Sequence, residues 1–222
     1  RLVRARTNRT TAPSTSRKGH AVTTPTTSKV LLEVEDLHTY FVTKTGTVKA
    51  VNGVSLALRE DSVLGLVGES GSGKTVTALS ILRLVPFPGK IVSGSIPYQG
   101  EDLLQMKPEE MRRLRGKEIS LVFQDAGTSL NPVIPIGRQV EEIMLEHTNI
   151  GKKEARALSV ELLGQMGIPD AKQTLDRFPF QLSGGMAQRV MMAIGLALNP
   201  RVLIADEPTS NLDVTLQAEM LQ

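Results

Sequence analysis

The stretch GESGSGKT, residues 68–75, decides the fold of this chain. It fits the pattern G-x-x-x-x-G-K-[ST], in which glycines let successive backbone N–H groups turn toward phosphate oxygens and Lys74 reaches the β and γ oxygens. Residues 62–67 before it form a compact apolar run, and residues 76–85 after it are apolar on most sides until Pro86. A strand, a glycine loop and a buried helix in this order predict a nucleotide site, because the positive end of the helix adds to the donors of the loop.

Length and composition restrict the class of protein. With 222 residues and 40% hydrophobic residues, the chain is long enough for one sizeable core, or for a core and a small subdomain. It has no cysteine and three histidines, which excludes disulfides and argues against a zinc site. No apolar run approaches the roughly 18 residues of a membrane span, and we expect a soluble chain.

The positive charge is concentrated at one end. Residues 1–32 hold seven of the 26 bases and no acid, which leaves 19 bases against 23 acids in the rest, a net charge of −4. Aromatic residues make up 3% of the chain, so nothing in the body resembles the basic, aromatic surface of a nucleic-acid binder. We therefore expect no nucleic-acid partner.

Residues 1–28 are predicted to be a disordered basic tail, followed by one domain over residues 29–222. The tail is rich in Thr, Ser, Arg and Pro and cannot bury enough apolar surface to fold. Its composition also resembles an organellar transit peptide. We prefer the alternative of a vector-derived or misassigned upstream extension, since the chain begins without Met.

The apolar patterns predict sheet, then helices, then sheet. Residues 30–37, 48–58 and 91–98 are typical of an antiparallel layer, residues 119–123 and 202–205 of buried strands, and residues 108–115 and 186–198 of helices. Further helices are expected between residues 136 and 166. The last of these places Ala155, Leu158, Leu162, Leu163 and Met166 on one apolar stripe.

A second motif, VLIADE at residues 202–207, ends an apolar run in two carboxylates. Asp206 and the hydroxyl of Thr75 are oxygen ligands suited to Mg²⁺. Glu207 is placed to orient or deprotonate an attacking water. Alone, such a pair is more often a solvated strand end, but with Lys74 and Thr75 in the same chain we favour the chemical role.

A third motif, LSGGM at residues 182–186, opens a helix and so presents N–H groups, a hydroxyl and a dipole end to an anion. A plain serine N-cap is the alternative. Residues 182–188 resemble the signature motif of ATP-binding cassette (ABC) ATPases. The order of phosphate loop, Gln124, signature, Asp206-Glu207 and SNLD at residues 210–213 matches that family throughout residues 30–222.

Within the family, three segments resemble the ATPase subunits of dipeptide and oligopeptide importers: FQD at 123–125, TSLNP at 128–132, and residues 181–190. The resemblance does not identify the cargo, because related systems carry nickel or other small solutes. It implies an ATP-hydrolysing subunit that energises an importer.

The fold implied by the resemblance is α/β: a P-loop NTPase (RecA-like) core with an antiparallel β-subdomain and a helical signature subdomain at about residues 127–185, incomplete at the C-terminus. The implied cofactors are ATP and Mg²⁺. Glu207, Gln124 and Lys74 would be catalytic, and Thr75, Gln124 and Asp206 would hold the metal. The residues implied to bind ATP are Phe41, Gly68, Ser70, Gly71, Ser72, Gly73, Lys74, Thr75, Val76, Ser183, Gly184, Gly185 and Asp213.

The resemblance also implies partners. Two ATPase subunits, identical or paralogous, would pair head to tail, so that ATP on the phosphate loop of one is closed by residues 183–185 of the other. Gln124 would link to transmembrane permease subunits at the cytoplasmic face of the inner membrane, with an extracytoplasmic solute-binding protein acting indirectly. Asp213 would communicate across the pair. Adenine would stack on Phe41 or Tyr40; we favour Phe41, against plain edge-strand packing.

The chain departs from the family pattern at several positions. Ala126-Gly127 replaces the usual Pro-Met, which predicts a less stiff glutamine loop, while Ala187 and Asn211 replace residues outside the expected chemistry. The switch histidine of the family is expected beyond Gln222, since the chain's three histidines, His20, His38 and His147, all precede the signature.

Two rival functions follow. One is a fragment that binds nucleotide without turnover. The other is a DNA-repair or chromosome-organising ABC ATPase, which the short helical insertion and the lack of cysteine disfavour.

Overall fold

A computed structural model describes residues 29–206 of the protein. The predicted disorder of residues 1–28 therefore lies outside the described residues. The chain divides into two compact units, one within residues 2–106 and the other within residues 107–222.

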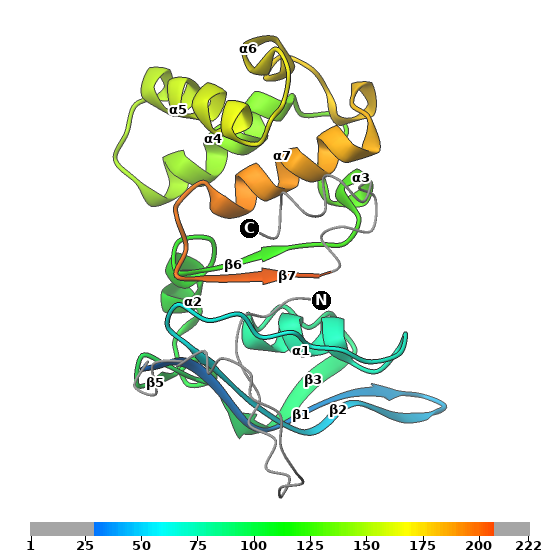
Figure 1. Ribbon diagram of the computed structural model, residues 1–222. Helices are drawn as coiled ribbons and strands as arrows, with labels where there is room; N and C mark the ends of the chain where they lie inside the picture. Colours follow the sequence, from blue (N-terminus) through cyan, green and yellow to red (C-terminus); the bar gives the residue numbers. More distant parts are fainter. Residues whose placement is uncertain (1–28, 207–222) are drawn as a thin grey trace, which may run out of the picture. The chain divides into compact units, whose positions relative to one another are not determined.

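The first unit is an antiparallel sheet with one helix. Strands β1 (Val30–Thr43) and β2 (Gly46–Arg59) form a long hairpin, and β3 (Gly89–Ser95) and β4 (Pro97–Tyr98) also pair with β1 (Figure 1). Strand β5 (Glu101–Asp102) pairs with β4. Helix α1 (Lys74–Ile81) packs on the sheet, where the buried hydroxyls of Thr39 and Ser80 are 2.8 Å apart. The antiparallel layer predicted from the sequence is thus confirmed.

The strand predicted at residues 62–67 is wrong. Only Gly65 forms an isolated bridge there, and the side chain of Val67 is 93% exposed. An apolar run becomes a strand only when neighbouring strands pair with its N–H and C=O groups. The antiparallel sheet of this unit runs β2-β1-β4-β5, with β3 on β1, and does not include these residues.

Helix α1 also ends earlier than Pro86 predicts. Arg83 takes a left-handed conformation with φ 53°, and the N–H of Leu84 donates to the carbonyl of Leu79 at 2.8 Å. This bond pattern stops a helix without proline. Nη1 of Arg83 donates to the carbonyls of Leu103 and Met106. These hydrogen bonds offset the cost of placing an arginine in a left-handed conformation that favours glycine.

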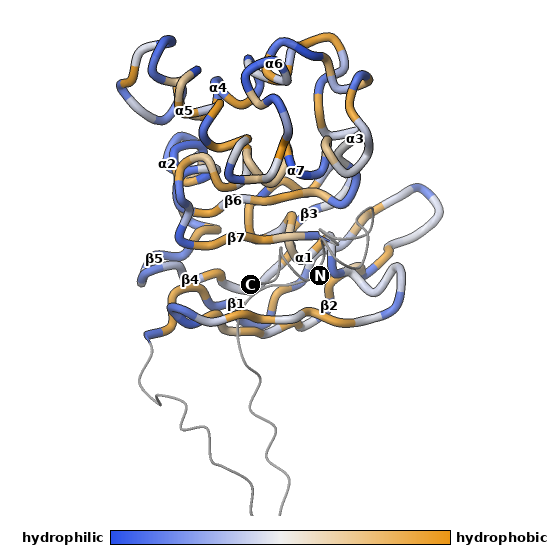
Figure 2. Tube along the Cα trace, turned by 45° about the horizontal axis from the view of Figure 1, so that its top comes forward, coloured by the Kyte–Doolittle hydropathy of each residue, from blue (hydrophilic) through white to orange (hydrophobic). Residues whose placement is uncertain are grey.

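The second unit is a parallel strand pair covered by helices. Strand β6 (Ile119–Val122) pairs with β7 (Val202–Ala205), from Ile119 opposite Val202 to Val122 opposite Ala205. Both strands are coloured hydrophobic over most of their length in Figure 2. The helices are α2 (Pro108–Leu114), α3 (Ala126–Ser129), α4 (Ile136–His147), α5 (Lys152–Gln165), α6 (Ala171–Thr174), the short 3₁₀ helix η1 (Pro179–Gln181) and α7 (Gly184–Leu196).

Helix α7 joins the strands to the other helices (Figure 1). A Cβ atom at Gly195 would lie 2.6 Å from Cγ2 of Val122, so α7 approaches β6 at van der Waals contact. On its other side α7 contributes to a core that includes Val140, Met144 and Leu163. The strands and the helices of this unit therefore share one hydrophobic core.

The stripe predicted on α5 is partly wrong. Ala155 and Leu163 are buried, but Leu158 is 40% exposed. The third buried position is Ser159, whose hydroxyl donates to the carbonyl of Ala155 at 2.8 Å. This internal hydrogen bond lets a polar residue occupy the buried face, which apolar periodicity alone does not reveal.

Candidate functional site

The glycine loop of residues 68–73 ends against strand β2. Gly73 is the N-cap of α1 with φ 88°, and a Cβ atom there would lie 2.1 Å from the carbonyl oxygen of Ala50. A side chain is excluded both by this contact and by the left-handed conformation. Gly73 thus fixes the start of α1 on the sheet.

Lys74 closes the loop into a ring. Its side chain is mostly buried, and Nζ donates to the carbonyls of Gly68 and Glu69 and to Oγ of Ser72 at 3.2 Å. These three contacts match the three donors of an ammonium group. Residues 68–71 are exposed, whereas the Lys74 cation beside them is buried.

The first turn of α1 adds backbone donors at the same place. The N–H of Thr77 makes the first helical bond, to the carbonyl of Gly73 at 2.8 Å. The N–H groups of Lys74, Thr75 and Val76 precede it, and a helix has no carbonyl for such groups within itself. A cation, a helix N-terminus and an exposed glycine loop together suit an anion such as a phosphate group.

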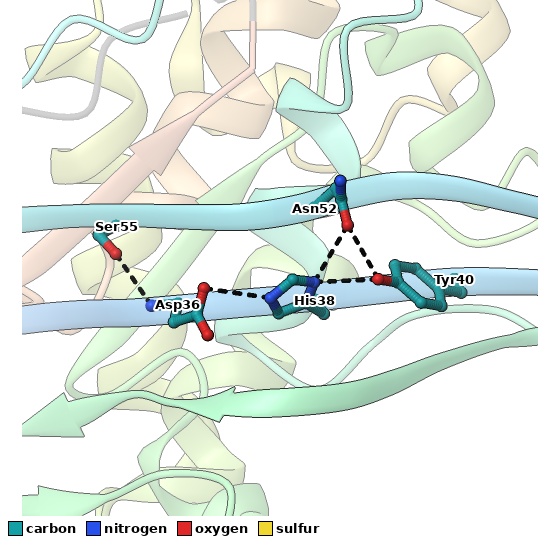
Figure 3. A network of polar contacts seen from close by, with 5 residues as sticks. All are labelled: Asp36, His38, Tyr40, Asn52 and Ser55. Atoms are coloured by element: carbon teal, nitrogen blue, oxygen red, sulfur yellow. Dashed lines mark hydrogen bonds and ion pairs between the residues drawn. The ribbon is translucent and has the colours of Figure 1, made fainter.

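Phe41 and Tyr40 lie on opposite faces of the sheet. Thr39 lies two residues before Phe41 and so on the same face of the strand, and its hydroxyl contacts Ser80 of α1. The Phe41 ring lies beside Gly89, where an added Cβ atom would be 2.7 Å from Cε1 of the ring. Tyr40 instead belongs to a polar network on the other face (Figure 3), where its hydroxyl donates to Oδ1 of Asn52 at 2.9 Å.

That network occupies the outer face of the hairpin. His38 lies 3.0 Å from the Tyr40 hydroxyl, and its Nε2 lies 3.1 Å from Oδ1 of Asp36. The Lys49 ammonium lies 5.5 Å from the centre of the Tyr40 ring. Between the two aromatic candidates, the geometry favours Phe41, because it shares the face of the sheet on which α1 and its glycine loop lie.

Gln124 and Asp206 follow neighbouring parallel strands. The N–H of Asp206 donates to the carbonyl of Val122 at 2.9 Å, and Gln124 comes two residues after Val122. The Asp206 side chain is buried, with 4% of its residue surface exposed, whereas Gln124 is exposed. The carboxyl ends of β6 and β7 are therefore followed by an amide and a carboxylate, whose oxygen atoms are ligands of the kind that Mg²⁺ prefers.

Asp125, to which the sequence motifs assign no role, stabilises the turn after Gln124. Its Oδ1 accepts from the N–H of Gly127 at 2.9 Å, and its carbonyl accepts from the Ser129 hydroxyl at 2.7 Å. Asp before a short helix is an N-cap signal that was available in the sequence. These bonds hold the segment in which Ala126-Gly127 predicts a less stiff loop.

Ser183 is the N-cap of α7. Its Oγ accepts from the N–H of Met186 at 3.3 Å, and its carbonyl accepts from Ala187 at 2.9 Å. The helix begins at Gly184, two residues before the predicted start, because the serine rather than the second glycine caps it. Ser183 and Gly184 are exposed, and a Cβ atom at Gly184 would meet nothing within 4 Å.

The comparison with known sequences decides the family. The profile described as ABC transporter matches residues 51–210. This chain belongs to the ABC transporter family.

Similar proteins of this family are named as transport ATP-binding proteins. The oligopeptide transport ATP-binding protein OppD of Bacillus subtilis is 48% identical over 193 residues, which are 86% of this chain and 54% of OppD. The dipeptide transport ATP-binding protein DppD of Escherichia coli is 43% identical over 192 residues, 86% of this chain and 59% of DppD. The chain thus spans little more than half the length of these relatives.

The fold is that of an α/β ATP-binding cassette. A solved structure of the cassette MJ0796, dimeric and bound to ADP and Pi in a post-hydrolysis state, superposes with a TM-score of 0.75. It is 25% identical, and the match covers 86% of this chain and 80% of MJ0796. The family match and this structural similarity together show that the chain is a nucleotide-binding domain of the ABC type.

Two predicted site residues, Glu207 and Asp213, lie outside the described residues. The family departure at Asn211 lies outside them too. Thr75 belongs to one unit and Gln124 and Asp206 to the other, so their common metal site stays a prediction. Across residues 29–206, no helix has the length and apolar character needed to cross a bilayer.

Proposed function

We propose that this chain is the ATP-binding and ATP-hydrolysing part of a subunit that energises an ABC importer for dipeptides, oligopeptides or related small solutes. The observation that carries the proposal is the glycine loop closed by Lys74 at the start of α1. The peptide class rests on relatives such as OppD and DppD, at 48% and 43% identity.

In this proposal the chain's own groups bind and orient the triphosphate. The loop N–H groups and Lys74 hold its oxygens, and the Phe41 ring stacks on adenine. Thr75, Gln124 and Asp206 hold Mg²⁺, which when bound neutralises charge on the phosphate oxygens. Glu207 orients the attacking water and accepts its proton.

The same proposal assigns Ser183, Gly184 and Gly185 to a second ATP, bound on the loop of a partner ATPase subunit, identical or paralogous. The exposure of Ser183 and Gly184 at the N-terminus of α7 supports this, because a Cβ atom at Gly184 would meet nothing within 4 Å among the described residues. Asp213 serves communication between the two subunits. The helical subdomain at about residues 127–185 then faces permease subunits at the cytoplasmic side of the membrane, and a solute-binding protein acts from the other side.

The test is Glu207→Gln in the full-length protein. We expect ATP to bind as before while phosphate release falls by about 10²- to 10⁴-fold, the usual contribution of a general base. Glu161→Gln, on the exposed face of α5, is the matched control and should keep normal turnover. Normal turnover with bound ATP in Glu207→Gln would show that Glu207 is not the base.

A parallel measurement on residues 1–222 alone separates the enzyme from a fragment that binds without turnover. We expect the fragment to bind ATP through the loop of residues 68–75. Phosphate release that appears only in the longer protein would assign the missing step to residues outside this chain.

A further inference from the structure

We infer that Gln139 is a positioning residue that joins the segment after Gln124 to the segment before Ser183. The two segments meet at the first turn of α4. Asn131 lies seven residues after Gln124, and Arg177 lies six residues before Ser183. The inference rests on the roles proposed for Gln124 and Ser183.

The first half of the junction is the Gln139 side chain. Its Oε1 accepts from the N–H of Asn131 at 2.9 Å, while Nε2 donates to the carbonyls of Asn131 at 3.0 Å and Ile134 at 2.7 Å. The opposite orientation of the amide would set its oxygen against two carbonyls, so the contacts determine which atom is which. One side chain thus bonds the N–H and the carbonyl of Asn131 and the carbonyl of Ile134.

The turn is also closed from within. Oδ1 of Asn131 accepts from the N–H of Val133 at 3.1 Å, and the N–H of Ile134 donates to the carbonyl of Asn131 at 3.2 Å. Gln139 therefore holds a preformed turn rather than a loose loop. Its side chain is half-buried, where an unpaired amide group is costly.

The second half of the junction is the backbone of the same helical turn. The N–H of Ile136 donates to the carbonyl of Arg177 at 2.9 Å, and the N–H of Gly137 donates to the carbonyl of Leu175 at 2.8 Å. A Cβ atom at Gly137 would lie 2.9 Å from that Leu175 oxygen, so a side chain at this position would clash with the carbonyl.

An ion-pair bridge strengthens this half. Arg156 of α5 donates to Glu141 of α4 at 3.2 Å and to Asp176, beside Leu175 and Arg177, at 2.6 Å. The hydrogen bond to Asp176 raises the pKa of Arg156 above its ordinary value. The segment that leads to η1 and Ser183 is therefore held to α4 by both backbone and side chains.

The consequence is mechanical. A displacement of the turn at residues 131–134 passes through Gln139 into the first turn of α4, and from there into residues 175–177. Gln139 contacts neither nucleotide-binding segment itself. Its loss should lower turnover by uncoupling the two segments, with little effect on the affinity for ATP.

The test compares Gln139→Leu with Gln165→Leu in the full-length protein, by hydrogen exchange and ATP turnover. Gln165 is an exposed glutamine on α5, bonded to Glu161 at 3.3 Å, and controls for the substitution itself. In Gln139→Leu we expect amide exchange about tenfold faster or more at Asn131, and also faster at Ile136, Gly137 and Met186. We expect kcat to fall at least fivefold, with KM for ATP within about twofold of the original. Gln139→Glu keeps the acceptor for Asn131 but sets a carboxylate oxygen against the carbonyls of Asn131 and Ile134, so it should change exchange and kcat in the same direction as Gln139→Leu.

Faster exchange confined to residues 131–134, with kcat equal to the Gln165→Leu control, would overturn the inference and make Gln139 a local clamp. If Gln139→Leu does not fold, the same readings on Gln139→Glu decide. If the original protein does not hydrolyse ATP, the proposed function fails. Exchange at Ile136, Gly137 and Met186 then still decides the junction, because unchanged rates there contradict it.

Discussion

At the level of single residues, substitutions of the neighbours Phe41 and Tyr40 are expected to distinguish ATP binding from the stability of the sheet. Phe41 lies on the face of the sheet that carries α1, and Tyr40 lies in the network of His38 and Asn52 on the other face. We expect Phe41→Ala to weaken ATP binding by about 10- to 100-fold, since stacking contributes about 1–3 kcal/mol per base. Tyr40→Ala should leave ATP affinity unchanged and lower only the melting temperature. Equal ATP affinity for both variants, measured with a fluorescent ATP analogue, would remove Phe41 from the site.

At the scale of elements, Gly94 decides how closely β3 approaches β1. It has φ 109°, and a Cβ atom there would lie 2.8 Å from the carbonyl oxygens of Glu35 and Asp36. Gly94→Ala is expected to lower the free energy of unfolding by about 1–3 kcal/mol, measured by chemical denaturation. Gly164→Ala on α5 is the control: a Cβ there meets nothing within 4 Å, and alanine should stabilise by about 0.4–1 kcal/mol. An unchanged free energy of unfolding in Gly94→Ala would show that β1 and β3 can shift to make room for the methyl group.

The elements also show what the sequence can predict. The phosphate loop, β6, β7 and α7 follow from local signals: glycines at set spacing, short apolar runs, and a serine before two glycines. The end of α1 at Ile81 depends on a left-handed Arg83 bonded to Leu103 and Met106, which are far away in the sequence. The missing strand at residues 62–67 likewise depends on pairing partners, and the hydrogen bonds of Gln139 depend on the shape of the turn at residues 131–134. None of these has a local signature.

At the level of the whole molecule, we propose that each ATP is bound by two subunits. Lys74 would hold it from the loop of one chain, and Ser183 would cover it from the other. In a pair of identical chains, a variant in either residue removes both sites. In a pair of one Lys74→Ala chain and one Ser183→Arg chain, both substitutions fall in the same ATP site. The second site is then formed by the original residues at both positions.

Phosphate release by this mixture tests whether each ATP site is formed by two chains. Each variant alone should be inactive. Mixing equal amounts of the two full-length proteins should restore turnover in proportion to the fraction of pairs that contain one chain of each variant. A mixture as inactive as its components, with both variants folded and paired, would contradict the account, because Ser183 would then not complete an ATP site on the loop of a partner chain.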